Sequence, residues 1–461
     1  MKHLKSRSGN VPPNRSKWTA RLLGIALAVI LLAGCSSIED IPDTVTQWFN
    51  QTFPKTGEPA GALLTTPTPL VTEQPTESAQ PAQPTSDGPQ TLTIWVPPQF
   101  DPESGSTAGN IMKAQLAAFV QENPDVLINV RVKAVSGPSS LLDSLNLANA
   151  TAKKSVPNLI ALPRENLESA VLKELIVPVD EFSYQIDDSD WYEYARQLTM
   201  VQGTVYGLPF AGDALALLYR PEKIGTPPNQ WTELIKHGQP ILFPAADTQA
   251  LFPLNLYLST GASLEDSQNR PFLEAETLGQ VLELIQSGSL SGSFPAGLNQ
   301  YLTDNQSWQA YREMKGDMVI TWISRYLSEL PADTAGAVLP SYGPDPYSSA
   351  SGWVWCLTNI DPVAQNMSIK LAEKLVEKDF LAALTQEAGF LPTRPSTLAQ
   401  WSNANSRNLA SEIIESTRSQ PRNMLISSVG PAMEEAVIKV LLQQSDPDLA
   451  AQAAVERLNT P

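Results

Sequence analysis

An aspartate between two apolar runs is the first feature of this sequence that could bind or transform a small molecule. Residues 203–220, GTVYGLPFAGDALALLYR, contain the runs Val205–Phe210 and Ala214–Tyr219, whose branched and aromatic residues suit β-strands. Asp213 lies between the runs. A carboxylate in this position could accept hydrogen bonds from a polar ligand or take part in acid–base chemistry.

The glycines and the proline of this stretch indicate how the chain passes Asp213. Gly207 and Gly212 permit close backbone approach, and Pro209 argues against one continuous central strand. We therefore expect the chain to bend or change sheets here, as it would when crossing between two lobes. Asp213 would then face a cleft, the usual place for a small-molecule site. The alternative is that Asp213 only caps the segment that follows it.

Other residue types needed for catalysis or metal binding are scarce. There are two histidines, His3 and His237, and two cysteines, Cys35 and Cys356, and none of them forms a cluster at metal-ligand spacing. No G-x-S-x-G motif occurs, and Asp213 has no second acid in a matching motif of the kind a glycoside hydrolase requires. We predict a protein that is not an enzyme and that carries no cofactor and no soft metal, while an oxygen-ligated calcium site stays open.

Composition indicates a folded body with an acidic surface. The chain has 461 residues, of which 42% are hydrophobic and 17% charged, and its formal net charge is −17. This length suits two lobes better than one core. The negative charge repels phosphate backbones, so nucleic acid is excluded as an expected partner.

The first 34 residues have the pattern of an export signal. Six Lys or Arg residues and no acidic residue precede the apolar run Leu22–Ala33. This run is too short to span a bilayer, which takes a helix of about 20 residues. The run ends in Leu-Ala-Gly-Cys, which resembles a bacterial lipoprotein lipobox and implies cleavage before Cys35 and lipid attachment, such as palmitate, to its thiol. The alternative is a secretory signal that happens to contain a cysteine.

Residues 35–90 have the composition of a stalk. Pro, Thr, Ser, Glu and Gln dominate from Lys55 to Gln90, and no Lys or Arg occurs between Lys55 and Lys113. Such a sequence cannot bury a core, so we expect a disordered, lipid-anchored linker.

The folded body begins at Thr91 with alternating strands and helices. Strands are expected at Leu92–Val96, Val126–Val135 and Asn158–Leu162, with helices at Ile111–Glu122, Ser139–Ala152 and Glu165–Leu172, and Leu175–Asp180 closes the unit. This order predicts an α/β layer with a mainly parallel sheet. Ligands gather at the carboxyl ends of such strands, here Pro97–Phe100 and Pro163–Glu165. Further helices are expected at Trp231–His237, Asp247–Leu258 and Glu276–Gln286.

Four segments together resemble the extracellular solute-binding proteins of ABC importers, family 1, which includes maltodextrin binders. They are Leu92–Val96 after a lipoprotein leader, Val205–Arg220, KGDMVITWISRY at Lys315–Tyr326, and GWVWCLT at Gly352–Thr358 with the following helix and Gly389–Arg394. The resemblance spans nearly all of residues 91–461.

The resemblance implies a type II periplasmic-binding-protein-like α/β fold with a cleft between two discontinuous lobes. One lobe would comprise residues 91–211 plus 339–385, and the other residues 212–338 plus 386–461.

The resemblance also implies the ligand-facing positions. Asp213 matches an acidic sugar contact, Ser324, Arg325 and Tyr326 match a ligand-facing turn, and Gln99 and Phe100 match the loop after the first strand. Trp353 and Trp322 could each line the cleft or fill the core, whereas Trp95, Trp355 and Cys356 are expected in the core and Arg394 is expected to brace a loop.

The function implied is that of a monomeric, lipid-anchored receptor on the extracytoplasmic face of the cell membrane. It would close on a solute, with a sugar or oligosaccharide expected, and deliver it to separate ABC permease subunits. Two alternatives stay open. One is a docking or sensor lipoprotein that keeps the fold without a ligand, which is favoured by Pro97 and Pro98 in place of the polar residues often found in that loop of the family. The other is a surface glycoside hydrolase.

Overall fold

The computed structural model describes residues 89–180, 183–358 and 362–459, all of which fall in the unit 84–461. The predicted signal peptide, Cys35 and most of the predicted stalk lie outside the described residues. The strands are β1 (Gln90–Val96), β2 (Val126–Val132), β3 (Leu159–Pro163), β4 (Met200–Val201), β5 (Thr204–Val205), β6 (Leu208–Tyr219), β7 (Ile241–Leu242), β8 (Met318–Trp322), β9 (Ala335–Ala337), β10 (Ser348–Leu357) and β11 (Thr417–Ser419). The helices are α3 (Thr107–Glu122), α4 (Leu141–Thr151), α5 (Arg164–Leu172), α6 (Glu193–Leu198), α7 (Pro221–Ile224), α8 (Trp231–Leu234), α9 (Leu251–Ser259), α10 (Ala275–Ser291), α11 (Asp304–Arg312), α12 (Ser324–Leu327), α13 (Pro362–Lys374), α14 (Lys378–Ala388), α15 (Pro395–Leu398), α16 (Ala404–Ser416), α17 (Asn423–Leu441) and α18 (Pro447–Asn459).

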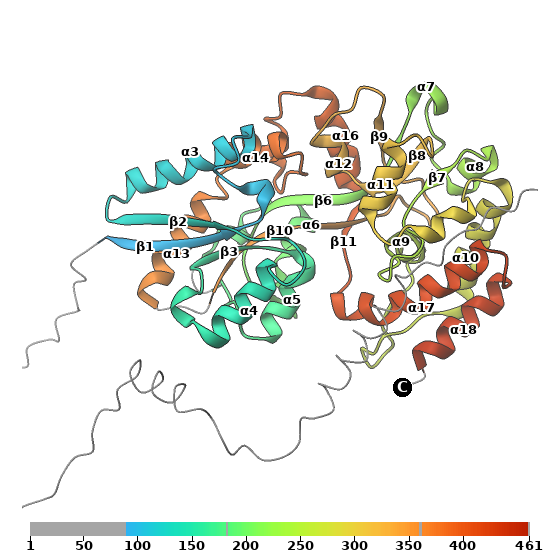
Figure 1. Cartoon of the computed structure of the whole chain (residues 1–461), viewed down its shortest axis with the longest axis horizontal. Helices are drawn as coiled ribbons and strands as arrows, with labels where there is room; N and C mark the ends of the chain where they lie inside the picture. The colour runs from blue at the N-terminus through green and yellow to red at the C-terminus, as the bar shows by residue number, and fades with distance from the viewer. Residues whose placement is uncertain (1–88, 181–182, 359–361, 460–461) are drawn as a thin grey trace, which may run out of the picture. The chain divides into compact units, whose positions relative to one another are not determined.

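Within the described residues, nine strands form one mixed sheet built around β6 and β10. The strand order is β2-β1-β3-β10-β6-β8-β7, with β11 paired to β10 and β9 paired to β6. Figure 1 shows β6 and β10 running from the group β1–β3 towards the group that contains β7, β8 and β9. These two long strands therefore carry the chain between two groups of elements.

The first group is the predicted α/β layer. β1 pairs in parallel with both β2 and β3, as the alternation of strands and helices predicts. In Figure 1, α3 and α14 lie on one side of these strands, and α4 and α5 lie on the other. The segment Leu175–Asp180, expected to close this unit, forms an isolated bridge between Ile176 and Thr358, and the antiparallel β10 lies beside β3.

The prediction that Pro209 interrupts the central strand is also wrong. β6 is continuous over twelve residues, and its pairing with β10 shifts register where Val354 faces Pro209 and Trp353 faces Ala211. A bulge at Phe210 thus accommodates the residue that lacks an amide hydrogen, which is where sheets tolerate proline. The predicted change of sheet partners does occur, because Leu208–Ala214 pairs with β10 and Leu215–Tyr219 pairs with β8.

Close backbone approach explains the glycine before Asp213. A Cβ on Gly212 would lie 2.2 Å from the hydroxyl oxygen of Tyr194, and Gly212 exchanges two backbone hydrogen bonds with Leu391. The segment 389–394 is therefore bonded directly to β6 beside Asp213.

The second group is mainly helical and has its own aromatic core. α10 packs on α17 and α18, and α17 also packs on α9. Trp231, Phe243, Phe252 and Phe294 make ring contacts with centroids 4.7–6.5 Å apart. The helices predicted in this region are present with shifted ends: α8 and a 3₁₀ turn replace one helix, α9 begins four residues later, and α10 is longer.

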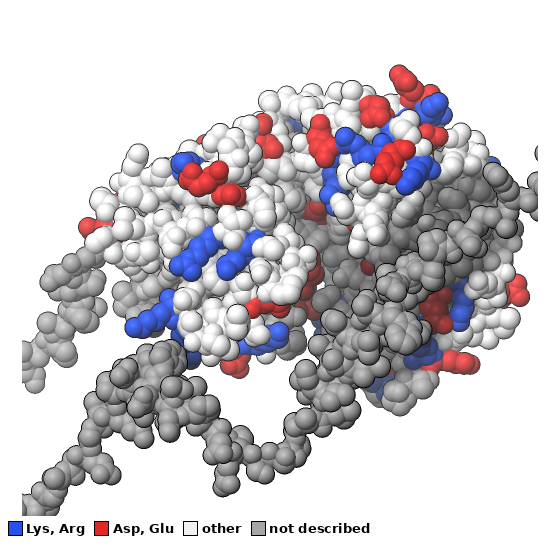
Figure 2. Space-filling model, in the orientation of Figure 1, with Lys and Arg blue, Asp and Glu red and all other residues white. Residues whose placement is uncertain are grey.

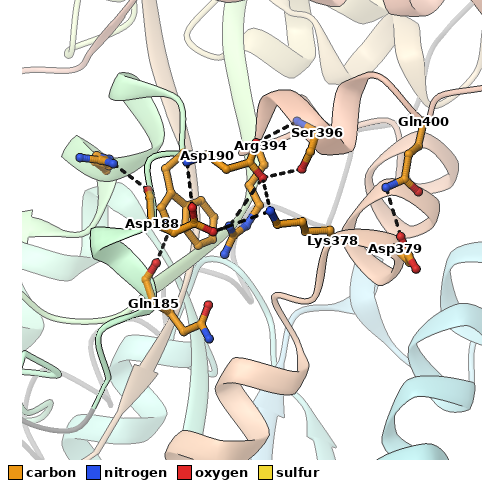
Figure 3. Close-up of polar contacts among 10 residues, drawn as sticks. Gln185, Asp188, Asp190, Lys378, Asp379, Arg394, Ser396 and Gln400 are labelled. Atoms are coloured by element: carbon orange, nitrogen blue, oxygen red, sulfur yellow. Dashed lines mark hydrogen bonds and ion pairs between the residues drawn. The ribbon is translucent and has the colours of Figure 1, made fainter.

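A buried arginine fastens the C-terminal segment to the loop before α6 (Figure 3). Arg394, 2% exposed, donates from Nη1 to Asp188 (2.8 Å) and stacks 3.5 Å above the ring of Trp191. Lys378 pairs with Asp190 at 3.0 Å. Arg394 thus has the bracing position that the sequence predicts. Elsewhere on the surface, Figure 2 shows red and blue side chains interspersed on an otherwise mainly uncharged described face.

Candidate functional site

A cleft of about 490 Å³ opens where the two groups of elements meet at β6 and β10, a volume typical of small-molecule sites. The first group contributes Gln99, after β1, and residues 163–165, at the end of β3. The shared strands contribute Asp213 and residues 351–353. The helical group contributes the turn from Trp322 to Arg325 and residues between β11 and α17. Both predicted strand ends therefore reach the cleft.

Asp213 is a partly buried carboxylate that holds the first turn of α12. Its Oδ1 accepts from the amides of Ala214 (3.0 Å) and Ser324 (3.1 Å), and its Oδ2 accepts from the Ser324 hydroxyl (2.5 Å). Asp213 therefore holds the start of a helix and lines the cleft at the same time, whereas the alternative interpretation of the sequence gave it only a capping role. The helix it caps is α12, more than a hundred residues later, and not the segment directly after it.

Electrostatics make this carboxylate unusual. Burial raises the pKa of Asp213 to about 7, the hydrogen bonds from Ser324 oppose the shift, and the nearby Asp304 carboxylate adds to it. Asp213 makes no ion pair among the described residues. Near neutral pH the group therefore changes its charge state, and in either state its remaining lone pairs can accept hydrogen bonds from a ligand.

Arg325 follows Ser324 in the same turn and is held by another carboxylate, that of Asp304. Its Nε and Nη2 donate to Oδ2 of Asp304 at 3.2 and 3.1 Å. Asp304 is the first residue of α11 and also accepts from the hydroxyl of Thr321 (2.5 Å). The guanidinium is therefore fixed in direction while part of it stays accessible to the cleft.

Two indole rings line the cleft, and two other predicted aromatic residues do not. Trp322 separates the cleft from a neighbouring cavity of about 260 Å³, and Trp353 lines the cleft while packing edge-on against Phe100. Phe100 has no exposed surface, because it also packs against Phe210 and Phe390. Tyr326 packs against the core and is not among the residues that line this cleft. Trp95, Trp355 and Cys356 are buried as predicted, and burial raises the pKa of the Cys356 thiol.

The structure adds cleft residues that sequence reasoning did not single out. Arg164 and Glu165 begin α5, Gln249 and Gln420 come from loops of the helical group, and Asn423 begins α17. The segment Pro163–Glu165 was marked by its place after a strand, but Gln249 and Gln420 carry no local pattern that could have marked them. Their role in the cleft follows only from the tertiary arrangement.

The described residues contain no cluster of His, Cys, Asp and Glu that could hold a metal ion. In that same part of the chain, no helix combines the length and apolarity needed to cross a bilayer.

The architecture is a mixed α/β sheet whose two long strands pass beneath a cleft, and it is that of the type II periplasmic-binding-protein fold. Carboxylates, guanidinium groups and indoles line the cleft. The model of the family described as bacterial extracellular solute-binding protein matches residues 114–408, and the chain belongs to this family.

Solved structures have the same fold. The cyclic alpha-maltosyl-1,6-maltose binding protein from Arthrobacter globiformis is 15% identical, with a TM-score of 0.67 over 81% of this chain and 98% of that one. The sugar-binding protein MalE from Xanthomonas citri is 18% identical, with a TM-score of 0.66 over 80% and 96% of the two chains. The GacH receptor of Streptomyces glaucescens, solved with acarbose, is 17% identical, with a TM-score of 0.62 over 80% and 97%. No curated protein matches this chain significantly.

Proposed function

We propose that this protein is the sugar- or oligosaccharide-binding receptor of an ABC importer. The observation that carries the proposal is one cleft that combines a carboxylate, a fixed guanidinium and indole rings at Asp213, Arg325, Trp322 and Trp353. Sugars present hydroxyl groups at their rims and apolar faces on their rings, so planar hydrogen-bonding groups and aromatic rings are suited to bind them. The sugar ligands named for the structurally similar proteins agree with this chemistry.

The receptor would bind by closing two lobes around the solute. We place the lobes at residues 91–211 plus 339–385 and 212–338 plus 386–461, so that the chain crosses between them within β6, between β9 and β10, and within α14. Only a closed arrangement lets Gln99 on one side and Arg325 on the other touch the same ligand, so the solute would shift an open–closed equilibrium.

The finer proposal for location is a lipid anchor at Cys35 on the extracytoplasmic face of the membrane, with residues 35–90 as a stalk. Two or more acyl chains give stable anchoring, which would keep the monomeric receptor near its permease subunits. Mass spectrometry of the chain from a bacterial membrane fraction should find Cys35 as the acylated N-terminus. An unmodified N-terminus elsewhere contradicts the anchor but not the sugar site.

Catalysis is not part of the proposal. The family consists of solute-binding proteins. A glycoside hydrolase would need a second carboxylate that faces Asp213 across the glycosidic bond to be cleaved. A docking or sensor role without a ligand remains the alternative outcome of the binding test.

The test is isothermal titration calorimetry of the full chain against maltose, maltotriose, maltotetraose, tagatose, polyols and amino acids. Saturable binding of one sugar class, with that sugar recovered intact after long incubation, supports the receptor. Binding of amino acids alone, or of nothing, contradicts the sugar proposal, and release of shorter sugars indicates an enzyme.

A further inference from the structure

Three arginines among the described residues are buried, and one of them differs from the others in its surroundings. Arg220 pairs with Asp333, donates to the carbonyl of Tyr311 (2.7 Å) and lies over the Tyr311 ring. Arg394 has two carboxylates within 3.8 Å and the Trp191 ring. Arg164, 6% exposed, has one hydrogen bond, from Nη2 to Oε1 of Glu168 (3.1 Å). Arg394 also has one hydrogen bond, but Arg164 has only one carboxylate in ion-pair distance and no ring contact among the described residues.

Arg164 is also the one of the three that lines the cleft. Its Nε is buried and makes no hydrogen bond with the described protein atoms, which is equally true of Arg220 and Arg394, so its place at the cleft is what sets it apart. A guanidinium has five N–H donors in a fixed plane, and leaving buried donors without acceptors is costly. Burial lowers the pKa of Arg164, which Glu168 only partly offsets. Because Arg164 lines the cleft, the side of its guanidinium that faces the cleft is available to acceptor oxygens of a solute, whereas the buried Nε is not.

Glu168 connects this arginine to the opposite side of the cleft. While its Oε1 accepts from Arg164, its Oε2 accepts from the amide of Asn423 (2.7 Å), the first residue of α17. α17 has no capping bond from its own N-cap side chain, so the carboxylate of α5 satisfies this helix end and lies at its positive pole. α5 packs on β3 and β10, whereas α17 packs on α9, α10 and α18 (Figure 1).

We propose that Arg164 is a solute-binding residue that donates to sugar oxygens, and that Glu168 is the residue that positions it. This deepens the proposed function and rests on it. A movement of α17 relative to α5 shifts the Glu168 carboxylate and, through it, the guanidinium. The orientation of one binding group is thereby linked to the relative position of the two sides of the cleft.

The test measures the affinity of the full chain for the sugar of the calorimetry panel that wild type binds most tightly. Arg164→Met should weaken binding about 10- to 100-fold, because a charged hydrogen-bond donor is lost. Arg164→Lys keeps the charge and should retain part of the affinity. Arg220→Met removes a buried arginine that does not line the cleft and should leave the affinity of the folded protein unchanged.

A double-mutant cycle tests the role of Glu168. Glu168→Gln should weaken binding about 3- to 10-fold in wild type and have no further effect in Arg164→Met, because it acts through Arg164. Equal effects in both backgrounds overturn the positioning role. Unchanged affinity in folded Arg164→Met and Arg164→Lys overturns the inference alone, whereas a wild type that binds no sugar overturns it together with the proposed function.

Discussion

Two aspartates of this protein make the same hydrogen bonds and have opposite electrostatics. Asp213 accepts from the amide (3.1 Å) and the hydroxyl (2.5 Å) of Ser324, at the start of α12. Asp190 accepts from the amide (3.1 Å) and the hydroxyl (2.5 Å) of Ser396, at the start of α15 (Figure 3). The pKa of Asp213 is raised, mainly by burial, to about 7. The pKa of Asp190 is lowered, because the bonds from Ser396 and Lys378 outweigh the effect of burial.

The difference between them is the cation. Lys378 lies 3.0 Å from Asp190 and Arg394 lies 3.8 Å away, whereas Asp213 has no ion pair among the described residues and the carboxylate of Asp304 raises its pKa further. A carboxylate that the fold has already neutralised serves stability. A carboxylate without a cation partner, at the wall of a cleft, can bind polar groups of a ligand. The comparison predicts that substitutions at the two sites separate stability from binding.

The largest effect is expected from removing the cation of the stable site. Arg394→Met leaves Asp188 and Asp190 with Lys378 alone, so the free energy of unfolding should fall by about 3 kcal/mol, as when a buried pair loses one partner. Urea unfolding measures it. Sugar affinity of the folded variant should stay at the wild-type value, and a loss of affinity would break the division between the two sites.

Removing the cleft carboxylate should act mainly on binding. Asp213→Ala should weaken sugar affinity by about 1–3 kcal/mol, because an acceptor for sugar hydroxyls is lost. Calorimetry measures this change. Asp190→Ala is the matched control, which removes the same pair of serine bonds without touching the cleft, and its affinity should be unchanged.

The two sites should respond to pH with opposite sign. Because the folded-state pKa of Asp213 lies above its unfolded value, the folded state binds more protons between about pH 4 and pH 7, and stability from this group falls as the pH rises through that range. Asp213→Asn should therefore raise the free energy of unfolding at pH 8 relative to pH 4.5 by about 3 kcal/mol compared with wild type, because one pKa unit corresponds to about 1.4 kcal/mol.

Asp190 should change the free energy of unfolding with pH in the opposite direction. Its folded-state pKa is lowered, so its contribution is present above the unfolded value of about 4 and is lost as the pH falls through the folded one. Asp190→Asn should lower the free energy of unfolding at pH 8 by about 1–2 kcal/mol. A change of the same sign in both variants would show that the cation does not decide the difference.

The smallest effect concerns affinity near neutral pH. If sugar hydroxyls donate to ionised Asp213, affinity should fall by up to about tenfold per unit as the pH drops below 7. Titrations at pH 6, 7 and 8 measure the slope. Asp213→Asn should abolish it, and a slope that persists in this variant must come from another group.

Local patterns in the sequence predicted much of the first group of elements. β1, β2 and β3 have strong alternation or continuous apolar runs, and α3 and α10 have clear helical periodicity, so neighbouring residues determine them. Pro209 misled the prediction because the bulge at Phe210 depends on the register with β10, which lies far away in the chain. Leu175–Asp180 has the composition of a strand, but β10 is the strand that pairs with β3.

The candidate site was only partly predictable for the same reason. Asp213, Trp322, Ser324 and Arg325 stand in recognisable segments, and the structure brings them to one cleft with Gln99 and Trp353. Phe100 is one residue from Gln99 but faces the core, which depends on a 3₁₀ turn at Pro98–Phe100. The proposed binding role of Arg164 follows only from the structure, because it depends on the place of its guanidinium in the cleft and on how few partners the guanidinium has there.

The pairing of β3 with β10 has a consequence for how the chain is made. The pair joins Leu159 to Leu357, and β10 in turn pairs with Thr417–Ser419. A growing chain therefore exposes one edge of β3 until almost two hundred further residues have been synthesised. Unpaired strand edges are sites of aggregation, and such non-local pairing folds slowly. Fragments that end before β10 should accordingly depend on chaperones to stay in solution, whereas chains that reach residue 419 can complete the sheet themselves.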